Sequence, residues 1–203
     1  MTRTLDAAHA LLLCFAADGA DPATQALAGV LGLAFARHGR AWLPLPGLGV
    51  EATRAVMARR FPGADAALGL DWAALQGAER DEPRLDEIED LVGLLREHAD
   101  LAAGSPEERE AVAHALACAS LGDNHLWQDL LLSSRRELSA LIGHWFPALA
   151  RRNDRDMKWK KFFYKQLCER EELFVCKAPS CGVCSDYRLC FGPEEAAGLP
   201  AAA

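Results

Sequence analysis

Apolar residues recur at helical spacing along most of the chain. Between residues 86 and 100, Ile88, Leu91, Val92 and Leu95 fall on one face of a helix, while acidic residues occupy the first turns and the opposite face. Alanine and leucine dominate the first 145 residues and β-branched residues are few there, which favours helix over strand. The pattern therefore predicts an all-α fold.

Capping signals divide this pattern into separate helices. Asp21 followed by Pro22 is a typical helix start, because proline is well tolerated in the first turn. Ser105 and Ser134 each stand three residues before a glutamate, which is the spacing of a capping box. We expect helices over 5–17, 21–38, 50–60, 86–100, 106–121, 125–132, 135–146 and 157–171. Residues 61–84 are expected to be irregular or to contain a short helix near Trp72.

Polar residues also precede the two helices closest to the C-terminus. Asp123 or Asn124 is expected to cap the helix over 125–132, and Asn153 or Asp154 the helix over 157–171. After Glu172 the helical signal ends. We therefore expect three parts, which are a helical domain over 1–172, an irregular cysteine-rich metal-binding loop over 173–195, and a disordered tail over 196–203.

The length and composition are those of a globular protein. The 203 residues are enough for one sizeable hydrophobic core, and no apolar run approaches the ~18 residues that a membrane span needs. The first helix lacks the basic leader and the cleavage site of a signal peptide. We therefore expect a cytoplasmic protein with reduced thiols and no membrane association.

Charge is distributed unevenly along the chain. The net charge is −7, yet residues 151–165, called the basic belt below, carry seven basic and two acidic side chains. A nucleic-acid-binding protein would be basic over a wider surface, so no nucleic-acid partner is expected. The candidate binding residues of the basic belt are Arg155, Lys158, Lys160, Lys161 and Lys165.

Four cysteines follow the basic belt with the spacing Cys-x4-Cys-x2-Cys-x5-Cys. They are Cys176, Cys181, Cys184 and Cys190. A structural zinc site usually has two Cys-x2–4-Cys knuckles separated by a longer spacer. This loop is more compact, and a single chain wrapped around one bulky object suits an iron–sulfur-type cluster. Zinc remains the main alternative, and a reducing compartment disfavours disulfides.

Candidate ligands outside this motif are a thiol and an imidazole. Cys168 and His125 are candidate auxiliary metal ligands, although such residues more often pack in the core or stand at a helix start. Cys14 and Cys118 are expected to be core residues. No nucleophile pairs with the acidic residues around Glu87, so no catalytic residue is assigned and no enzyme activity is expected.

Three blocks of the sequence carry a resemblance to a known family. They are DNHLWQDL at 123–130, NDRDMKWKKFFYKQLCE at 153–169, and the cysteine motif ending in CFGPE at 176–194. They are similar to the NifQ family of nitrogen-fixation accessory proteins. The similarity spans about 85–195, and 85–172 is the best-matched part of the helical domain. One departure is Leu131, where the resemblance leads us to expect glycine.

The resemblance implies a molybdenum metallochaperone. NifQ proteins carry an iron–sulfur cluster that contains molybdenum, of the Mo-3Fe-4S type, and supply molybdenum for biosynthesis of the nitrogenase iron–molybdenum cofactor. Molybdate is the source, and the NifEN scaffold and the NifH iron protein are the recipients. Carried over to this chain, the resemblance makes the four motif cysteines the cluster ligands.

Two questions stay open at the level of sequence. The basic belt can be the solvated face of an amphipathic helix, a docking surface for an acidic partner, or a region that attracts the molybdate dianion. The rival functions are a structural zinc or 4Fe-4S protein that acts as an adaptor or an electron carrier, because either would use the same cysteines.

Overall fold

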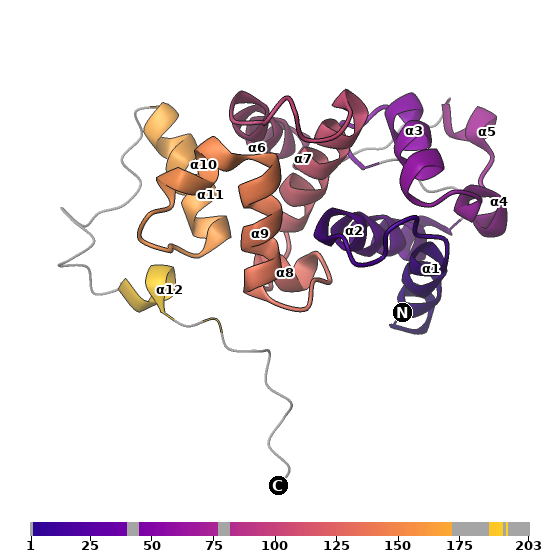
Figure 1. Cartoon of the computed structure of the whole chain (residues 1–203), viewed down its shortest axis with the longest axis horizontal. Coiled ribbons are helices and arrows are strands. Elements are labelled where there is room, and N and C mark those ends of the chain that lie inside the picture. The colour runs from indigo at the N-terminus through magenta and orange to yellow at the C-terminus, as the bar shows by residue number, and fades with distance from the viewer. Residues whose placement is uncertain (1, 40–44, 77–81, 172–186, 193, 195–203) are drawn as a thin grey trace, which may run out of the picture. The chain divides into compact units, whose positions relative to one another are not determined.

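The computed structural model describes residues 2–39, 45–76, 82–171, 187–192 and 194, and this part of the chain is helical without strands (Figure 1). The expected all-α class is thus confirmed. The chain divides into two compact units, Met1–Arg151 and Arg152–Ala203. In the described part, no helix combines the length and the hydrophobicity that crossing a bilayer requires.

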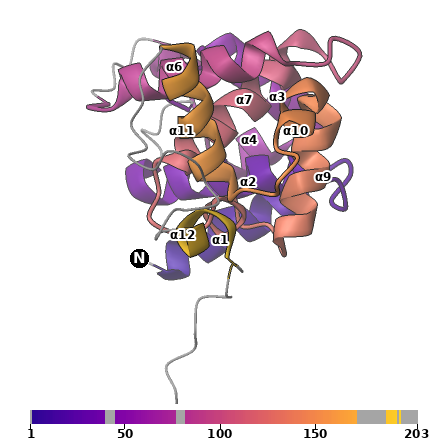
Figure 2. The same cartoon turned by 90° about the vertical axis from the view of Figure 1, so that its left-hand side faces the viewer.

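The first unit is built around two central helices (Figures 1 and 2). Helix α7 packs against α2, α3, α6 and α8, and α2 also packs against α1 and α9. Ten of the fifteen residues of α7 are buried, and many of them are alanines, which let neighbouring helices approach closely. The helices are α1 (Thr2–Cys14), α2 (Pro22–His38), α3 (Val50–Arg60), α4 (Ala64–Leu68), α5 (Trp72–Gln76), α6 (Leu85–Glu97), α7 (Pro106–Ser120), α8 (Leu126–Asp129), α9 (Arg135–Trp145) and α10 (Pro147–Arg152).

Three of the predicted helix starts are confirmed by their hydrogen bonds. Asp21 Oδ2 accepts from the N–H of Thr24 at 3.0 Å. Ser105 Oγ accepts from the N–H of Glu108 at 3.3 Å, and Glu108 accepts in return from the N–H of Ser105 at 2.9 Å. Ser134 Oγ accepts from the N–H of Glu137 at 3.3 Å, but the return bond to Glu137 Oε2 comes from the N–H of Ser133, so the reciprocal box is not formed at α9. Each of these bonds joins residues three or four positions apart, so the N-terminal ends of α2, α7 and α9 are determined by local sequence.

A charged cluster centred on Arg60 joins several of these helices. Its guanidinium binds Glu108 on α7 with Nε···Oε1 at 2.8 Å, and it also pairs with Asp21 before α2. Thr24 Oγ1 accepts a further bond at 2.9 Å. The guanidinium lies 5.7 Å from the ring centroid of Trp145 at the end of α9. One side chain of α3 therefore ties together α2, α7 and α9.

The region around α8 differs from the prediction. A helix was expected over 125–132, yet α8 ends at Asp129 and Leu131 has a left-handed backbone with φ of 56°. The chain turns here because it passes close to α2, where a Cβ placed on Gly29 would lie 2.5 Å from the carbonyl oxygen of Leu130. The predicted caps Asp123 and Asn124 were also wrong, because the N-cap is His125.

Two further helices in the first unit were not predicted. Helix α4 (Ala64–Leu68) is only five residues long, and the six-residue α10 begins at Pro147, directly after the helix expected over 135–146. Both are too short to show helical periodicity in the sequence. The expected short helix near Trp72 is present as α5.

The second unit contains α11 (Trp159–Arg170) and α12 (Tyr187–Phe191) in its described part. Trp159, Phe162 and Phe163 on α11 are buried, and their ring centroids lie 5.8–6.3 Å apart. The sequence placed an irregular loop over 173–195. The described residues of that range include a helical turn, α12, so the expectation of an irregular loop was wrong for 187–191. The predicted tail over 196–203 lies outside the described residues.

Candidate metal centre

The structure describes one of the four motif cysteines. Cys176, Cys181 and Cys184 lie outside the described residues, and their roles stay predictions. Cys190 lies in α12, where it is partly exposed and is not in a disulfide. The contacts given for its turn are with the segment at the start of α11.

Cys190 is attached to the start of α11 by its backbone. The N–H of Lys158, the N-cap residue of α11, donates to the carbonyl oxygen of Cys190 with N···O at 2.8 Å. This bond joins the motif to the basic belt. It also places Cys190 beside the N-terminus of a twelve-residue helix, where the helix dipole and free N–H groups favour negative charge.

An aromatic contact holds the same turn. The guanidinium of Arg155 lies 5.3 Å from the ring centroid of Phe191, and that ring also stacks on Tyr187 with centroids 4.6 Å apart. Gly192 then closes α12 by donating from its N–H to the carbonyl oxygen of Arg188 at 2.9 Å. A Cβ at position 192 would lie 2.5 Å from that oxygen, so the turn after Cys190 requires glycine.

Asn153 organises the segment that leads into α11. Its Oδ1 accepts from the N–H of Met157 at 2.8 Å, and its Nδ2 donates to the carbonyl oxygen of Met157 at 2.8 Å. Between them, Asp156 has a left-handed backbone with φ of 53°. The expectation that Asn153 or Asp154 caps the helix was wrong, because the side chain of Asn153 bridges a turn and α11 begins two residues after Met157.

The basic belt is partly engaged within the second unit. Arg155, Lys161 and Lys165 are exposed, and Lys158 and Lys160 are half-buried. Lys165 forms an ion pair with Glu169 at 3.0 Å, one turn further along α11. Lys158, Lys161 and Lys165 follow the spacing of one helix face, opposite the buried aromatic residues. The belt therefore presents a stripe of positive charge that begins next to Cys190.

Cys168 continues this lysine stripe three residues after Lys165. It is half-buried and lies away from the buried face of α11. Ten residues of helix, about 15 Å, separate it from the level of Lys158, where Cys190 is attached. A role for Cys168 as an auxiliary ligand stays a prediction.

The remaining candidates lie in the first unit. His125 is half-buried at the start of α8, and its N–H donates to Gln128 Oε1 at 3.1 Å. A metal-binding role for His125 stays a prediction. Cys14 was expected in the core, but it is exposed at the end of α1. Cys118 is half-buried and lines a cavity, so the core assignment holds only in part.

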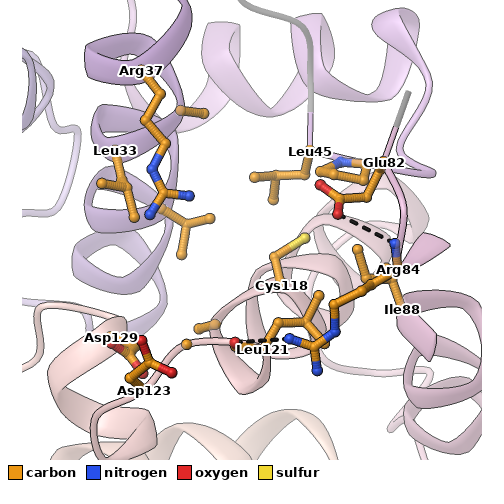
Figure 3. A pocket seen from close by; sticks show the side chains of 15 residues that line it. Leu33, Arg37, Leu45, Glu82, Arg84, Ile88, Cys118, Leu121, Asp123 and Asp129 are labelled. Atoms are coloured by element: carbon orange, nitrogen blue, oxygen red, sulfur yellow. Dashed lines mark hydrogen bonds between the residues drawn. The ribbon is translucent and has the colours of Figure 1, made fainter. Parts of the chain in front are cut away.

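That cavity, of about 300 Å³, lies between α2, α6 and α7 (Figure 3). Arg37 extends into it from α2, and the sulfur of Cys118 points into it from α7. Arg84 lies on the opposite side and donates to the carbonyl oxygen of Leu121 at 3.1 Å. Glu82, Asp123 and Asp129 complete its charged lining. Because both signs of charge are present, the lining favours neither a cation nor an anion.

The sequence model of the NifQ family matches residues 26–192. The chain is 49% identical to Protein NifQ of Azotobacter vinelandii over 113 residues, which are 56% of each protein. It is 46% identical to Protein NifQ of Rhodobacter capsulatus over 90 residues, which are 44% of this chain and 49% of that protein. A Protein NifQ homolog of Sinorhizobium fredii is 38% identical over 149 residues, which are 73% of this chain and 61% of that protein.

This chain belongs to the NifQ family. NifQ proteins are nitrogen-fixation proteins. The chain spans about half the length of the first two relatives. The family match begins at residue 26, so NifQ similarity extends further toward the N-terminus than the sequence blocks indicated. No solved structure matches the chain.

The donor chemistry of the described motif residue fits the predicted cluster site. Cys190 is a thiol, the ligand type that suits iron and sulfide-bridged metals. Among the described residues, no group of three or more His, Cys, Asp or Glu side chains is arranged to hold a metal ion. Sequence reasoning missed the bond of Lys158 to Cys190 and the contact of Arg155 with Phe191. It also missed the turn bonds of Asn153 with Met157 and of Gly192 with Arg188. Only Asn153 and Gly192 left a signal, since both are turn-forming residues.

Proposed function

We propose that this NifQ protein carries molybdenum and donates it for biosynthesis of the nitrogenase iron–molybdenum cofactor. The molybdenum is held with iron and sulfide in a cluster of the Mo-3Fe-4S type, and Cys176, Cys181, Cys184 and Cys190 are its ligands. The protein acts in the cytoplasm as a carrier and has no turnover chemistry of its own. Its recipients are the NifEN scaffold and the NifH iron protein.

The observation that carries this proposal is the extent of the family match. The match runs to residue 192 and so includes all four cysteines of the motif. Thiolates are the ligands that proteins use for iron–sulfur clusters, and soft sulfur donors suit a metal that must leave as a sulfide-bridged species. The partly exposed position of Cys190 supports a site from which cargo can be transferred.

The basic belt supports the uptake step. Molybdate is a dianion, and positive charge near the motif raises its local concentration. Lys158 and Lys161 lie on the stripe that begins beside Cys190, so attraction by these side chains would deliver the oxyanion to the ligands. Arg155, Lys160 and Lys165 add to the same field. Acidic surfaces of the recipient proteins would be attracted by the same charges.

Metal content tests the proposal directly. Wild type and Cys184→Ala are purified anaerobically and analysed for molybdenum, iron and zinc. We expect molybdenum and iron together in the wild type and the loss of both in the variant. Cys14→Ala is the matched control, because it removes an exposed thiol of the first unit. Zinc alone, near one per chain after loading with iron, sulfide and molybdate, would contradict the proposal and favour a structural zinc adaptor.

A transfer experiment distinguishes a molybdenum carrier from an electron-transfer protein. The loaded protein is mixed with the NifEN scaffold and the NifH iron protein, then separated by size under anaerobic conditions. A carrier loses molybdenum to the recipient. A conventional 4Fe-4S electron carrier contains no molybdenum and keeps its iron through repeated cycles of reduction and oxidation.

A further inference from the structure

The turn that bears Cys190 has two attachments to the segment before α11. One is the hydrogen bond from the N–H of Lys158 to the carbonyl oxygen of Cys190, at 2.8 Å. The other is the contact of Arg155 with the ring of Phe191, the residue next to Cys190, at 5.3 Å. Both partners before α11 lie within four residues of each other, so a single short segment holds the cysteine.

This segment is itself rigidly organised. Asn153 bonds both the N–H and the carbonyl oxygen of Met157, and Met157 is buried. The N–H of Asp156 also donates to the carbonyl oxygen of Asn153 at 3.1 Å. All of these bonds join protein atoms of residues 153–157, and none of them involves a motif cysteine. The platform that receives Cys190 is therefore organised by its own hydrogen bonds.

We propose that Arg155 is a positioning residue for Cys190, which it acts on through Phe191 to hold one ligand in place before metal arrives. The proposal rests on the proposed function, since it assigns Cys190 to the metal site. A ligand that is already ordered costs less conformational entropy when it binds. Arg155 thus has a role in this chain beyond adding one positive charge to the basic belt.

Lys161 separates this role from simple attraction of an oxyanion. It carries the same charge as Arg155, it is exposed, and it lies on the same lysine stripe. Arg155→Met and Lys161→Met each remove one charge from the basic belt. Only the first removes the cation from the Phe191 ring. Arg155→Lys restores a cation that can lie over that ring.

The first measurement uses the full chain in its metal-free, reduced form. Amide hydrogen exchange of Lys158 reports the bond to Cys190, because that N–H is protected while the bond is made. We expect Arg155→Met to lower this protection about two- to fivefold, the range that an exposed cation–π contact contributes. Lys161→Met is expected to leave it unchanged, and Arg155→Lys to restore part of it.

The second measurement is the rate of metal uptake under anaerobic conditions. Ferrous iron, sulfide and molybdate are added to each metal-free protein, and bound iron and molybdenum are followed over time. Both methionine variants lose some rate through the lost charge. We expect Arg155→Met to be slower than Lys161→Met by a further two- to fivefold, with partial recovery in Arg155→Lys.

Two results would overturn the positioning role while leaving the proposed function intact. One is unchanged Lys158 protection in Arg155→Met, and the other is equal uptake by the two methionine variants. A different result would overturn the proposed function and the positioning role together. That result is wild-type protein that takes up neither iron nor molybdenum although its Lys158 protection responds to Arg155→Met.

Discussion

Arg60 and Glu108, which are 48 residues apart in the sequence, form an ion pair with Nε···Oε1 at 2.8 Å. Their side chains are 15% and 6% exposed. Burial alone would raise the pKa of Glu108, but the hydrogen bond with the N–H of Ser105 and the charge of Arg60 outweigh it and lower that pKa from its ordinary value. The ionised carboxylate of Glu108 is therefore stabilised in the folded protein relative to the unfolded chain.

Glu108→Gln is expected to destabilise the fold by about 2 kcal/mol, because it leaves a largely buried guanidinium with one carboxylate fewer. Glutamine keeps an oxygen that can accept from Ser105, so the variant removes the charge and the bond from Arg60 while the cap of α7 is kept. Urea denaturation at neutral pH measures the loss. Glu107→Gln, at the exposed neighbouring position, removes a carboxylate from the same first turn without removing the bond to Arg60, so it is the comparison and should cost less stability than Glu108→Gln.

The Arg60–Glu108 pair also predicts that the free energy of unfolding falls at acidic pH. Because the folded pKa of Glu108 is depressed, its contribution is present above about pH 4.5 and is lost as the pH falls toward the folded pKa. Asp21 acts in the same direction, since its pKa is also lowered. Glu108→Gln should therefore flatten the fall in unfolding free energy below pH 4.5. If the free energy of unfolding of the variant fell as steeply below pH 4.5 as that of the wild type, Glu108 would not be responsible.

His114 predicts a second pH dependence in a higher range. Burial lowers its pKa from the ordinary value of 6.5, although the carbonyl oxygens of Glu110 and Gly47 favour the charged ring. Glu110 is itself held by Arg96 at 2.6 Å. The folded protein thus binds this proton less readily than the unfolded chain. The contribution of the neutral ring is present above pH 6.5 and is lost as the pH falls through the folded pKa.

The measurement is the free energy of unfolding at pH 7.5, 6.5 and 5.5. One proton can change it by no more than about 1.4 kcal/mol per pH unit. His114→Gln should reduce the slope in this range, whatever its cost at pH 7.5. His144→Gln removes an exposed imidazole and should keep the wild-type slope. Equal slopes in all three proteins would show that His114 is not responsible.

Leu131→Gly is expected to be more stable than Leu131→Ala by up to about 1 kcal/mol. Leu131 has φ of 56°, a left-handed conformation that costs a residue with a Cβ roughly 1 kcal/mol and glycine almost nothing. The leucine side chain is 38% exposed, so both variants also lose the packing of its buried part. Leu131→Ala is the matched comparison, because it loses the same packing and keeps the strain. The glycine variant should have the higher melting temperature of the two.

Gly192→Ala is expected to displace the turn that carries Cys190. The new Cβ would lie 2.5 Å from the carbonyl oxygen of Arg188, which belongs to the backbone and has little freedom to move away. Hydrogen exchange of the Lys158 amide should become faster, and iron bound per chain after anaerobic gel filtration should fall. Gly143→Ala, where a Cβ meets nothing within 4 Å, should leave both readouts unchanged. Wild-type exchange at Lys158 in Gly192→Ala would contradict the prediction.

Several features of this protein were predictable from sequence because they depend on neighbours in the chain. The caps formed by Asp21, Ser105 and Ser134 bond residues three positions away, and a local pattern is enough to identify them. The buried face of α6, which includes Ile88 and Leu95, follows from helical spacing in the same way. The resemblance to the NifQ family was also carried by contiguous blocks, and the family match confirms it.

Other features were decided only when distant segments met. The helix predicted over 125–132 ends at Asp129, because the following backbone must pass close to Gly29 on α2. Asn153 bridges a turn to Met157 instead of capping α11, since its amide satisfies two backbone groups there. Cys14 is exposed because its position at the end of α1 leaves it uncovered. Helical spacing in the sequence gives no information about these contacts or about the exposure of Cys14.

The sequence by itself determined which residue types carry the proposed metal chemistry, because thiol spacing and the basic belt are visible in the order of the residues. The tertiary structure decided where the described thiol of the motif lies. Cys190 is joined to Lys158 and flanked by the contact of Arg155 with Phe191, across a span of chain that no local pattern connects. Hydrogen bonds and ring contacts between such distant residues depend on folding, and folding therefore decided how this ligand is presented.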